Sequence, residues 1–333
     1  MRASVIGSGS FGTALANVLA VNCEQVGLWG RDAALADAIN TRHENSGYLP
    51  GIPISSRVQA TTDLKTALEG AELVVLATPS HATRQVISHA LPHLPKHAPL
   101  VTVAKGIENE TLLTMTELLE DCLPEEHHPY IAVLSGPSFA KELAQRMPTV
   151  VTIASHWHKV AVRCQKALQT ETFRSYTSND VVGVQYGGAL KNVIAIAAGI
   201  ADGLGMGHNA RAAIITRGLA EITRLAVRKG GNPLTLSGLS GMGDLVLTCT
   251  GELSRNRHVG MELGRGRSLQ DILGDMKQVA EGVKTAKSAR DLSRKVGVEL
   301  PICDQVYAIA YEGKSARAAV VELMTRQPKS ELV

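Results

Sequence analysis

Cysteine is scarce in this chain, and its five residues lie far apart in the sequence. No two have the short spacing of a metal-binding knuckle, and an odd number does not suit a disulfide framework. We therefore expect free thiols and a reducing compartment, the cytoplasm. The residues are Cys23, Cys122, Cys164, Cys249 and Cys303.

The sequence also lacks histidine pairs at metal-ligand spacing on a helix beside a carboxylate, so we expect no metal site. His127, His128, His156 and His158 fall in polar segments and are predicted to lie on the surface.

An excess of charge of one sign is missing as well. The 34 basic and 31 acidic residues leave a net charge of +3, and no run of Lys or Arg stands out. This balance gives no reason to expect nucleic acid or a membrane surface as a partner. The longest apolar tract, 181–201, contains Gln185, Lys191 and Asn192 and is a poor membrane span. The N-terminus leads directly into a strand-like run, without the features of a signal peptide.

The first half of the chain alternates short apolar runs with helical stretches. Val-rich runs such as 73–77 and 100–104 are typical of strands buried on both faces. This order predicts an α/β architecture with a doubly wound, mostly parallel sheet. The expected strands are 3–6, 26–29, 73–77, 100–104 and 131–134, with 149–154 and 173–176 as possible extensions of the sheet.

Around residue 180 the pattern changes to Ala-rich stretches with helical spacing. We predict a dinucleotide-binding domain over 1–180, an all-α substrate domain over 181–326 and a flexible tail over 327–333. The clearest helices are 211–229, 282–295 and 315–326, with Ser315 placed to cap the last of them, and another begins at Pro301.

A glycine motif, Gly7-Ser8-Gly9-Ser10-Phe11-Gly12, follows the first predicted strand and opens a helix. In this context the spacing indicates a dinucleotide site, because glycines let the backbone approach a pyrophosphate at a helix N-terminus. An ordinary glycine turn is the alternative.

The end of the second strand indicates which dinucleotide fits. Arg31 stands there and can accommodate a 2′-phosphate, whereas Asp32 is placed to cap the next helix. This favours NADPH without excluding NADH. A surface ion pair between the two residues is the alternative.

A general acid or base is needed to move a proton to or from an alcohol oxygen. Lys191 lies within a largely apolar helix, where burial would lower the pKa of its amine. Gly187 and Gly188, one turn earlier, would let a substrate or the other domain come close. A lysine that extends to solvent is the alternative.

Other polar residues follow predicted strands or fall in turns. Lys105 stands at a strand end that faces the ligand crevice, and Gly136 and Ser138 follow the next strand. Asp244 lies in a glycine-flanked turn, where it could orient a lysine. The triplet Ser254, Arg255, Asn256 suits a phosphate, with a salt-bridged loop as the alternative.

Taken together, these segments resemble the bacterial NAD(P)-dependent glycerol-3-phosphate dehydrogenases. The matching pieces occur in family order over residues 7 to about 281, and Phe11 stands where Trp is frequent. The resemblance implies a Rossmann-type N-terminal domain, a helical domain like that of 6-phosphogluconate dehydrogenase, Lys191 as proton acceptor and a role in phospholipid synthesis. Implied substrate contacts are Lys105, Gly136, Ser138, Lys191, Asp244, Ser254, Arg255 and Asn256. Besides the motif glycines Gly7, Gly9 and Gly12, the implied cofactor contacts are Ser10, Phe11, Arg31, Tyr48, Lys105, Ala140, Arg255, Val279 and Glu281.

Two rivals remain at this point: an enzyme of similar architecture that acts on a hydroxy acid or sugar derivative, and a cofactor-sensing protein without catalysis. The buried lysine speaks against the second, because such a group is costly unless it is used. A homodimer formed through the helical domain is the expected assembly.

Overall fold

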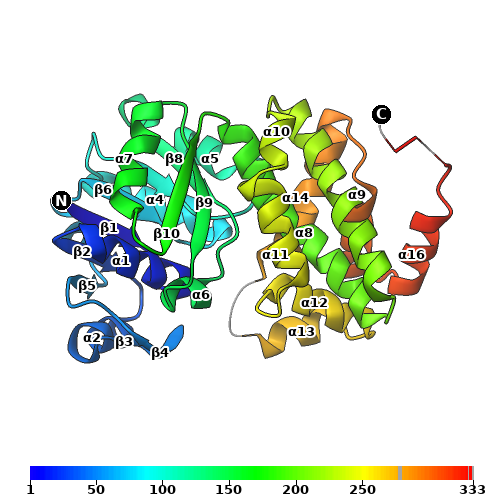
Figure 1. Ribbon diagram of the computed structural model, residues 1–333, viewed down its shortest axis with the longest axis horizontal. Helices are drawn as coiled ribbons and strands as arrows, with labels where there is room; N and C mark the ends of the chain where they lie inside the picture. Colours follow the sequence, from blue (N-terminus) through cyan, green and yellow to red (C-terminus); the bar gives the residue numbers. More distant parts are fainter. Residues whose placement is uncertain (277–279, 329, 332–333) are drawn as a thin grey trace.

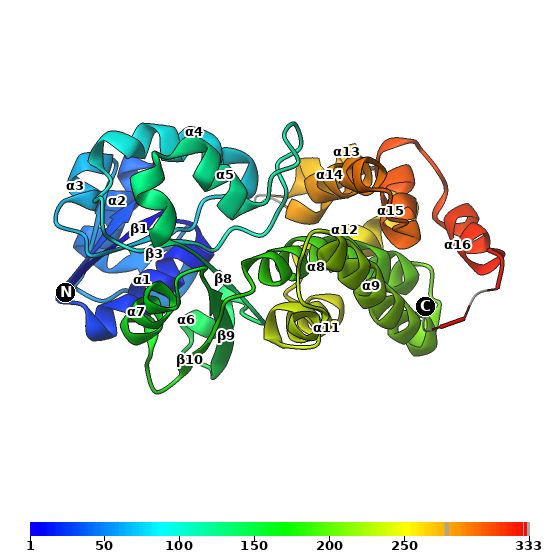
Figure 2. The ribbon, with the colours of Figure 1, turned by 90° about the horizontal axis from the view of Figure 1, so that it is seen from above.

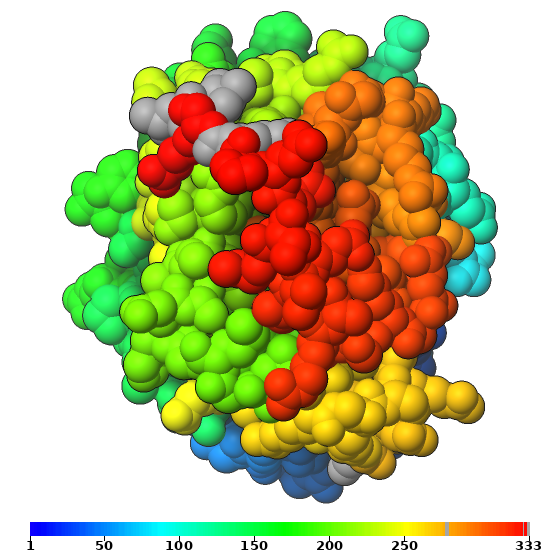
Figure 3. All heavy atoms as spheres, turned by 90° about the vertical axis from the view of Figure 1, so that its right-hand side faces the viewer, coloured from blue at the N-terminus to red at the C-terminus, as the bar shows by residue number. Residues whose placement is uncertain are grey.

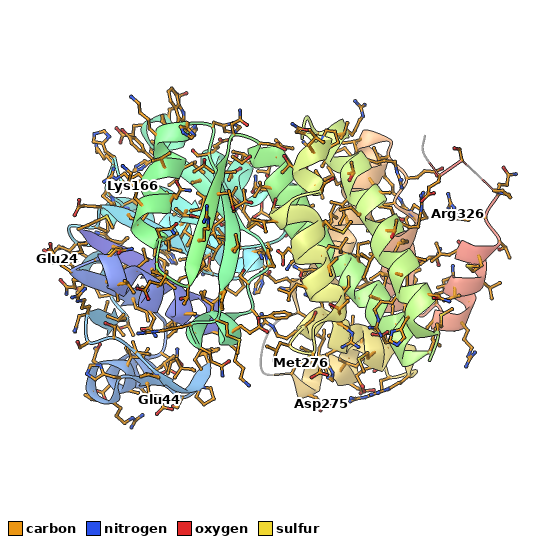
Figure 4. The ribbon with its side chains drawn as sticks, viewed as in Figure 1. Glu24, Glu44, Lys166, Asp275, Met276 and Arg326 are labelled. Carbon is orange, nitrogen blue, oxygen red and sulfur yellow. The ribbon has the colours of Figure 1, made fainter. Side chains whose placement is uncertain are left out.

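An eight-stranded sheet occupies one end of the molecule, and a bundle of helices occupies the other (Figure 1). The computed structural model describes residues 1–276, 280–328 and 330–331. Glu24 and Arg326, labelled in Figure 4, lie at opposite ends of the long axis. The predicted combination of an α/β half and an all-α half is therefore confirmed.

The strand order of the large sheet is β10-β9-β8-β7-β6-β1-β2-β5. The chain builds outward from β1 in one direction through β2 and β5, and then in the other direction from β6 to β10. The bounds are β1 Arg2–Ile6, β2 Gln25–Trp29, β5 Val58–Thr61, β6 Leu73–Leu76, β7 Leu100–Thr102, β8 Ile131–Ser135, β9 Thr149–Ala154 and β10 Phe173–Ser178; a separate hairpin joins β3 Glu44–Asn45 and β4 Leu49–Pro53.

All pairings in the large sheet are parallel except that of β8 with β9, which is antiparallel. The sheet is thus mostly parallel, as expected. The sequence did not reveal β3, β4 or β5, because these segments are short and have no continuous apolar run.

Helices cover both faces of the sheet, as a parallel sheet with buried faces requires. One layer contains α1, α6 and α7 and the other contains α3, α4 and α5, as Figure 2 shows. The bounds are α1 Ser10–Asn22, α2 Ala33–Arg42, α3 Leu64–Leu68, α4 Thr83–Ala90, α5 Met115–Cys122, α6 Ala140–Ala144 and α7 His158–Leu168.

The helical half is built around α8, Val181–Gly203, which packs against α9, α11, α12 and α14. By length and composition α8 could cross a membrane, but 94% of its most apolar window is buried inside the protein. It is the core helix of this half. The remaining bounds are α9 Gly207–Arg228, α10 Pro233–Leu236, α11 Asp244–Thr250, α12 Arg255–Gly264, α13 Leu269–Asp275, α14 Glu281–Val296, α15 Pro301–Tyr311 and α16 Ala316–Met324.

The end of the bundle carries α16, which lies beside α15 in the end-on view of Figure 3. Ser315 caps this helix by accepting a hydrogen bond from the Ala318 N–H group, as its position in the sequence predicts.

The prediction for His127 was wrong. This residue lies in a 3₁₀ helix, Glu125–Tyr130, and its side chain is buried.

The position of the domain boundary stays a prediction. The last strand of the sheet ends at Ser178 and α8 begins at Val181, which suits a boundary at residue 180. The flexible tail and the likeness to 6-phosphogluconate dehydrogenase are likewise untested.

Candidate active site

The turns after β1 and β6 lie side by side, because these strands are neighbours and the sheet changes its direction of growth between them. A Cβ atom on Gly7 would lie 2.6 Å from the Ala77 carbonyl oxygen, and Gly7 has a φ of +124°. Glycine is therefore required here by both space and backbone conformation. In doubly wound sheets such a switch point is where a ligand crevice forms.

The glycine turn fits a dinucleotide pyrophosphate. The N-terminus of α1 has no side-chain cap, so the backbone N–H groups of its first turn are free to bind an anion. A Cβ atom on Gly9 would meet nothing of this chain within 4 Å, whereas one on Gly12 would lie 1.9 Å from the Gly7 carbonyl oxygen. Packing thus explains Gly12, whereas no neighbour in the described part of the chain explains Gly9.

The β3–β4 hairpin supports this turn. The Asn45 side chain is fully buried and donates hydrogen bonds to the Ser8 carbonyl (2.9 Å) and the Thr13 hydroxyl (2.8 Å). Ser10 donates to the carbonyl of Tyr48, a half-exposed residue on the same hairpin (2.9 Å). Tyr48 is therefore close to the predicted cofactor turn. Asn45 was missed, because a single asparagine in a loop gives no signal in the sequence.

Arg31 and Asp32 do not form an ion pair with each other among the described residues, and Asp32 has the capping role that the sequence predicts. Asp32 caps α2 by accepting a hydrogen bond from the Leu35 N–H group (3.1 Å). Arg31 is exposed directly after Gly30, at the carboxyl end of β2. That position matches the place where doubly wound domains meet the adenosine ribose.

Three charged side chains meet where the sheet faces the helices. Lys191 donates hydrogen bonds to Asp244 Oδ1 and to the Thr248 hydroxyl (2.8 Å to Oγ1). Lys105 donates to Asp244 Oδ2 (2.7 Å) and to the Gly136 carbonyl (3.1 Å). One carboxylate thus joins a lysine from α8 to a lysine that follows β7.

Both ends of the Lys191–Asp244 pair are removed from solvent. The exposed fraction is 6% for Lys191 and 0% for Asp244. Burial lowers the pKa of Lys191 to about 8, against the attraction of Asp244, and Lys105 lowers it further by repulsion. An amine with this pKa can donate or accept a proton near neutral pH.

Local structure places each member of this cluster. A Cβ atom on Gly188 would lie 2.6 Å from the Ser135 hydroxyl oxygen and 3.6 Å from Lys105 Cγ, so glycine lets the sheet approach α8 one turn before Lys191. Asp244 begins α11 after a π-helical turn, Leu239–Gly243. Thr248 is one helical turn later and faces the same side. Thr248 was not among the residues that the sequence predicted for the site.

The predicted phosphate triplet lies at the start of α12. Ser254 caps this helix by accepting from the Arg257 N–H group (3.2 Å), and Arg255 is exposed. Asn256 is buried, donates to Asn192 Oδ1 (2.9 Å) and accepts from the Gly282 N–H group (3.0 Å). The triplet therefore also joins α12 to α8 and α14.

Glu281 links the two halves at the first turn of α14. Its Oε1 accepts a hydrogen bond from the Ser80 N–H group (3.1 Å) in the turn after β6. Burial raises the pKa of Glu281, while Arg255 and the two lysines oppose the rise. Ser80 was not among the residues that the sequence predicted for the site.

The remaining predicted residues surround the same region. Gly136, with a φ of +147°, and Ser138 follow β8, and Ser138 donates to the Gly136 carbonyl (2.9 Å). Ala140 is the first residue of α6, which packs against α1. Val279 lies outside the residues that the structure describes.

The fold and this junction define a nicotinamide-dinucleotide-dependent oxidoreductase. Two family models match, the N-terminal and C-terminal parts of NAD-dependent glycerol-3-phosphate dehydrogenase, over residues 2–161 and 180–321. The chain therefore belongs to the NAD-dependent glycerol-3-phosphate dehydrogenase family.

Similar proteins agree with this assignment. A protein of Myxococcus xanthus named glycerol-3-phosphate dehydrogenase [NAD(P)+] is 83% identical over 332 residues, 100% of this chain and 99% of its own length. One of Anaeromyxobacter dehalogenans with the same name is 57% identical over the full length of both chains. The crystal structure of glycerol-3-phosphate dehydrogenase from Coxiella burnetii has a TM-score of 0.91 at 38% identity and covers 98% of this chain and 99% of its own. The resemblance seen in the sequence is confirmed, and so is a nicotinamide cofactor, NADPH or NADH.

The substitution Gly9→Ala separates cofactor binding from folding. Gly9 has φ −70° and ψ 179°, which alanine adopts without strain, and its Cβ would meet no protein atom. We expect an unchanged melting temperature and at least a tenfold rise in the NADPH dissociation constant, measured by cofactor fluorescence.

Two variants serve as controls for this test. Gly12→Ala should lower the melting temperature because its Cβ would clash with the Gly7 carbonyl. Gly274→Ala, on α13, should leave the NADPH affinity unchanged and should not lower the melting temperature. Normal NADPH affinity in the Gly9→Ala protein would contradict the assigned path of the pyrophosphate.

Proposed function

We propose that this protein reduces dihydroxyacetone phosphate to sn-glycerol 3-phosphate, with Lys191 as the acid and NADPH as the preferred cofactor. The observation that carries the proposal is the buried amine of Lys191, held on Asp244 where the sheet meets the helices. The relatives from Myxococcus xanthus and Anaeromyxobacter dehalogenans, both named glycerol-3-phosphate dehydrogenase [NAD(P)+], support this proposal.

The cofactor supplies a hydride to C2 of the substrate when it is bound. Protonated Lys191 donates a proton to the C2 oxygen as negative charge develops there, and it becomes neutral in the same step. Asp244 and Thr248 fix the direction of the amine, because they accept two of its three possible hydrogen bonds. In the reverse direction the neutral amine accepts the hydroxyl proton.

Lys105 is proposed to contact the substrate oxygen or phosphate. Its amine donates a hydrogen bond to Asp244 Oδ2, and Lys191 donates to Oδ1 of the same carboxylate, so the two amines face one small region. Gly136 and Ser138 are proposed to contact the substrate from the end of β8.

The phosphate is proposed to bind at the start of α12. Arg255 offers the charged fork there. Ser254 accepts rather than donates in its capping bond, so its hydroxyl hydrogen can be given to a phosphate oxygen. Asn256 spends one amide hydrogen on Asn192 and retains the other. These three donors would hold the phosphate at a fixed distance from C2, which is a positioning effect.

The cofactor is proposed to run from Arg31, past the glycine turn and Tyr48, to the region of Lys105, Ala140, Arg255 and Glu281. Val279 belongs to the same proposal on the strength of the resemblance alone.

Physiological reduction would supply the backbone for phospholipids. We infer a cytoplasmic homodimer formed through the helical domain, which analytical ultracentrifugation tests directly.

The rival substrate class is a hydroxy acid or a sugar derivative. The group Ser254, Arg255 and Asn256 favours a phosphate over a carboxylate, because it provides donors for three oxygens. A steady-state assay of dihydroxyacetone phosphate against 2-oxo acids, with NADPH and NADH in turn, decides between the two.

The substitution Lys191→Ala should abolish turnover and leave NADPH binding intact. The variant loses the acid, whereas Asp244 keeps Lys105 as its partner. We expect kcat for reduction to fall by roughly 10³-fold or more, a loss typical of removing a general acid. Turnover close to that of the parent enzyme would remove Lys191 from this role.

The rate of reduction should depend on pH through Lys191. Because its pKa is lowered to about 8, the protonated acid disappears above that pH, and kcat/KM for dihydroxyacetone phosphate should fall about tenfold per unit. The oxidation of sn-glycerol 3-phosphate should instead rise up to about pH 8, since it needs the neutral amine. A reduction rate that stays flat to pH 10, with the protein folded by circular dichroism, is incompatible with this assignment.

The substitution Arg31→Ala should change the choice of cofactor. It removes the proposed partner of the 2′-phosphate while Asp32 continues to cap α2. We expect kcat/KM with NADPH to fall at least tenfold and the value with NADH to stay within about twofold. Equal losses with both cofactors would show that Arg31 does not read the 2′-phosphate.

A further inference from the structure

The segment between β7 and α5 reaches from the sheet to the helices, as Figure 2 shows. It carries Lys105 at its start. Ile107 is buried in the core of the helical half, and its backbone forms a bridge with Thr114. The segment closes on itself, because the Glu108 N–H group donates to the Leu113 carbonyl (2.9 Å). We refer to residues 105–114 as the lysine arm.

A forked ion pair holds the middle of the lysine arm to the sheet side. Arg84, on α4, donates from Nε to Glu108 Oε1 (2.9 Å) and from Nη2 to Glu108 Oε2 (2.8 Å). Its third nitrogen, Nη1, donates to Asp121 Oδ2 on α5 (2.6 Å). Within the arm, the Thr111 hydroxyl also donates to Glu108.

This pair differs from an ordinary surface salt bridge. Glu108 is only 17% exposed, and both of its oxygens are held by one planar guanidinium. Such bidentate pairs fix direction as well as distance. The hydrogen bonds from Arg84 keep the pKa of Glu108 below its ordinary value, so the carboxylate stays charged.

The far end of the lysine arm is held by α8. Gln185 accepts a hydrogen bond from the Thr116 N–H group (2.8 Å) and donates to the hydroxyls of Thr114 (3.1 Å) and Thr116 (2.6 Å). Gln185 lies on the same helix as Lys191. The arm is thus fixed at its middle to α4 and at its end to α8, with Lys105 at the start.

We infer that Arg84 and Glu108 are positioning residues for the reduction. Their ion pair, which we call the clamp, keeps the amine of Lys105 hydrogen-bonded to Asp244. The inference rests on the role proposed above for Lys105. No hydrogen bond or ion pair of the described residues joins the side chain of Arg84 or Glu108 to the cofactor turn or to either lysine, so both act through the backbone of the lysine arm. A small displacement of a positioned group can lower a rate by up to about 10²-fold.

The test uses Arg84→Lys in the full-length enzyme. Lysine keeps the charge but cannot hold both oxygens of Glu108 together with Asp121. The matched control is Arg267→Lys, because Arg267 likewise joins a mostly buried carboxylate, Glu262, to an exposed one, Asp275. We expect similar melting temperatures for both variants and a five- to fiftyfold fall in kcat/KM for dihydroxyacetone phosphate only for Arg84→Lys. Glu108→Gln should give the same result if Arg84→Lys does not fold.

A second readout distinguishes positioning from a general loss of structure. The charged groups around Lys191 are Asp244, Lys105 and Glu281, with the Cys249 thiol nearby. If Lys105 leaves Asp244, Lys191 loses a repulsive neighbour, and the alkaline limb of the reduction profile should move to higher pH. The control variant should leave this limb in place.

A double-mutant cycle with Lys105→Ala completes the test. If the clamp acts through Lys105, adding Arg84→Lys to Lys105→Ala should cause no further loss. Losses of kcat/KM that multiply in the double variant would overturn the inference. An Arg84→Lys enzyme that matches Arg267→Lys in rate and pH profile would overturn it as well. Either result would leave the proposed function unaffected. A Lys105→Ala enzyme with normal kinetics would instead contradict the proposed role of Lys105, and the clamp would fall with it.

Discussion

The structure depends on one buried carboxylate, Asp244, which accepts hydrogen bonds from two lysines of different parts of the chain. An ion of this kind is tolerated away from water only when its partners are in place. Breaking such a buried pair typically costs about 3–5 kcal/mol. The same interaction gives Lys191 its chemistry, since burial lowers the pKa of its amine while the carboxylate keeps the amine in one direction.

Most of the surrounding architecture brings these groups together. The sheet delivers Lys105 and Gly136 at the ends of adjacent strands, and α8 delivers Lys191. Gly188 allows the sheet to approach α8, and Glu281 accepts a hydrogen bond from the turn after β6. Polar contacts therefore join the two halves where a substrate is proposed to bind.

The sequence predicted the parts that depend on local patterns. The buried strands were visible as Val-rich runs, and the caps at Asp32 and Ser315 were visible from residue type and position. Strand β5 was not, because its alternating polar residues resemble a loop. His127 was placed wrongly, since its burial depends on how a 3₁₀ turn packs against distant residues.

The sequence predicted which residues belong to the site better than it predicted how they are arranged. Lys105, Lys191 and Asp244 were each singled out, but no pattern could show that they share hydrogen bonds across 139 and 53 positions of sequence. Asn45 and Ser80 gave no signal, because their roles come from long-range backbone contacts. Arg84 and Glu108 were missed for the same reason, although Glu108 stands three residues after Lys105.

The role of Lys191 as the acid can be tested directly by a crystal structure of the enzyme with an unreactive NADPH analogue and dihydroxyacetone phosphate. We expect the amine of Lys191 to lie within hydrogen-bond distance of the C2 oxygen while it still contacts Asp244. An amine that points into solvent, or a substrate whose C2 oxygen is bound by other groups, would contradict it.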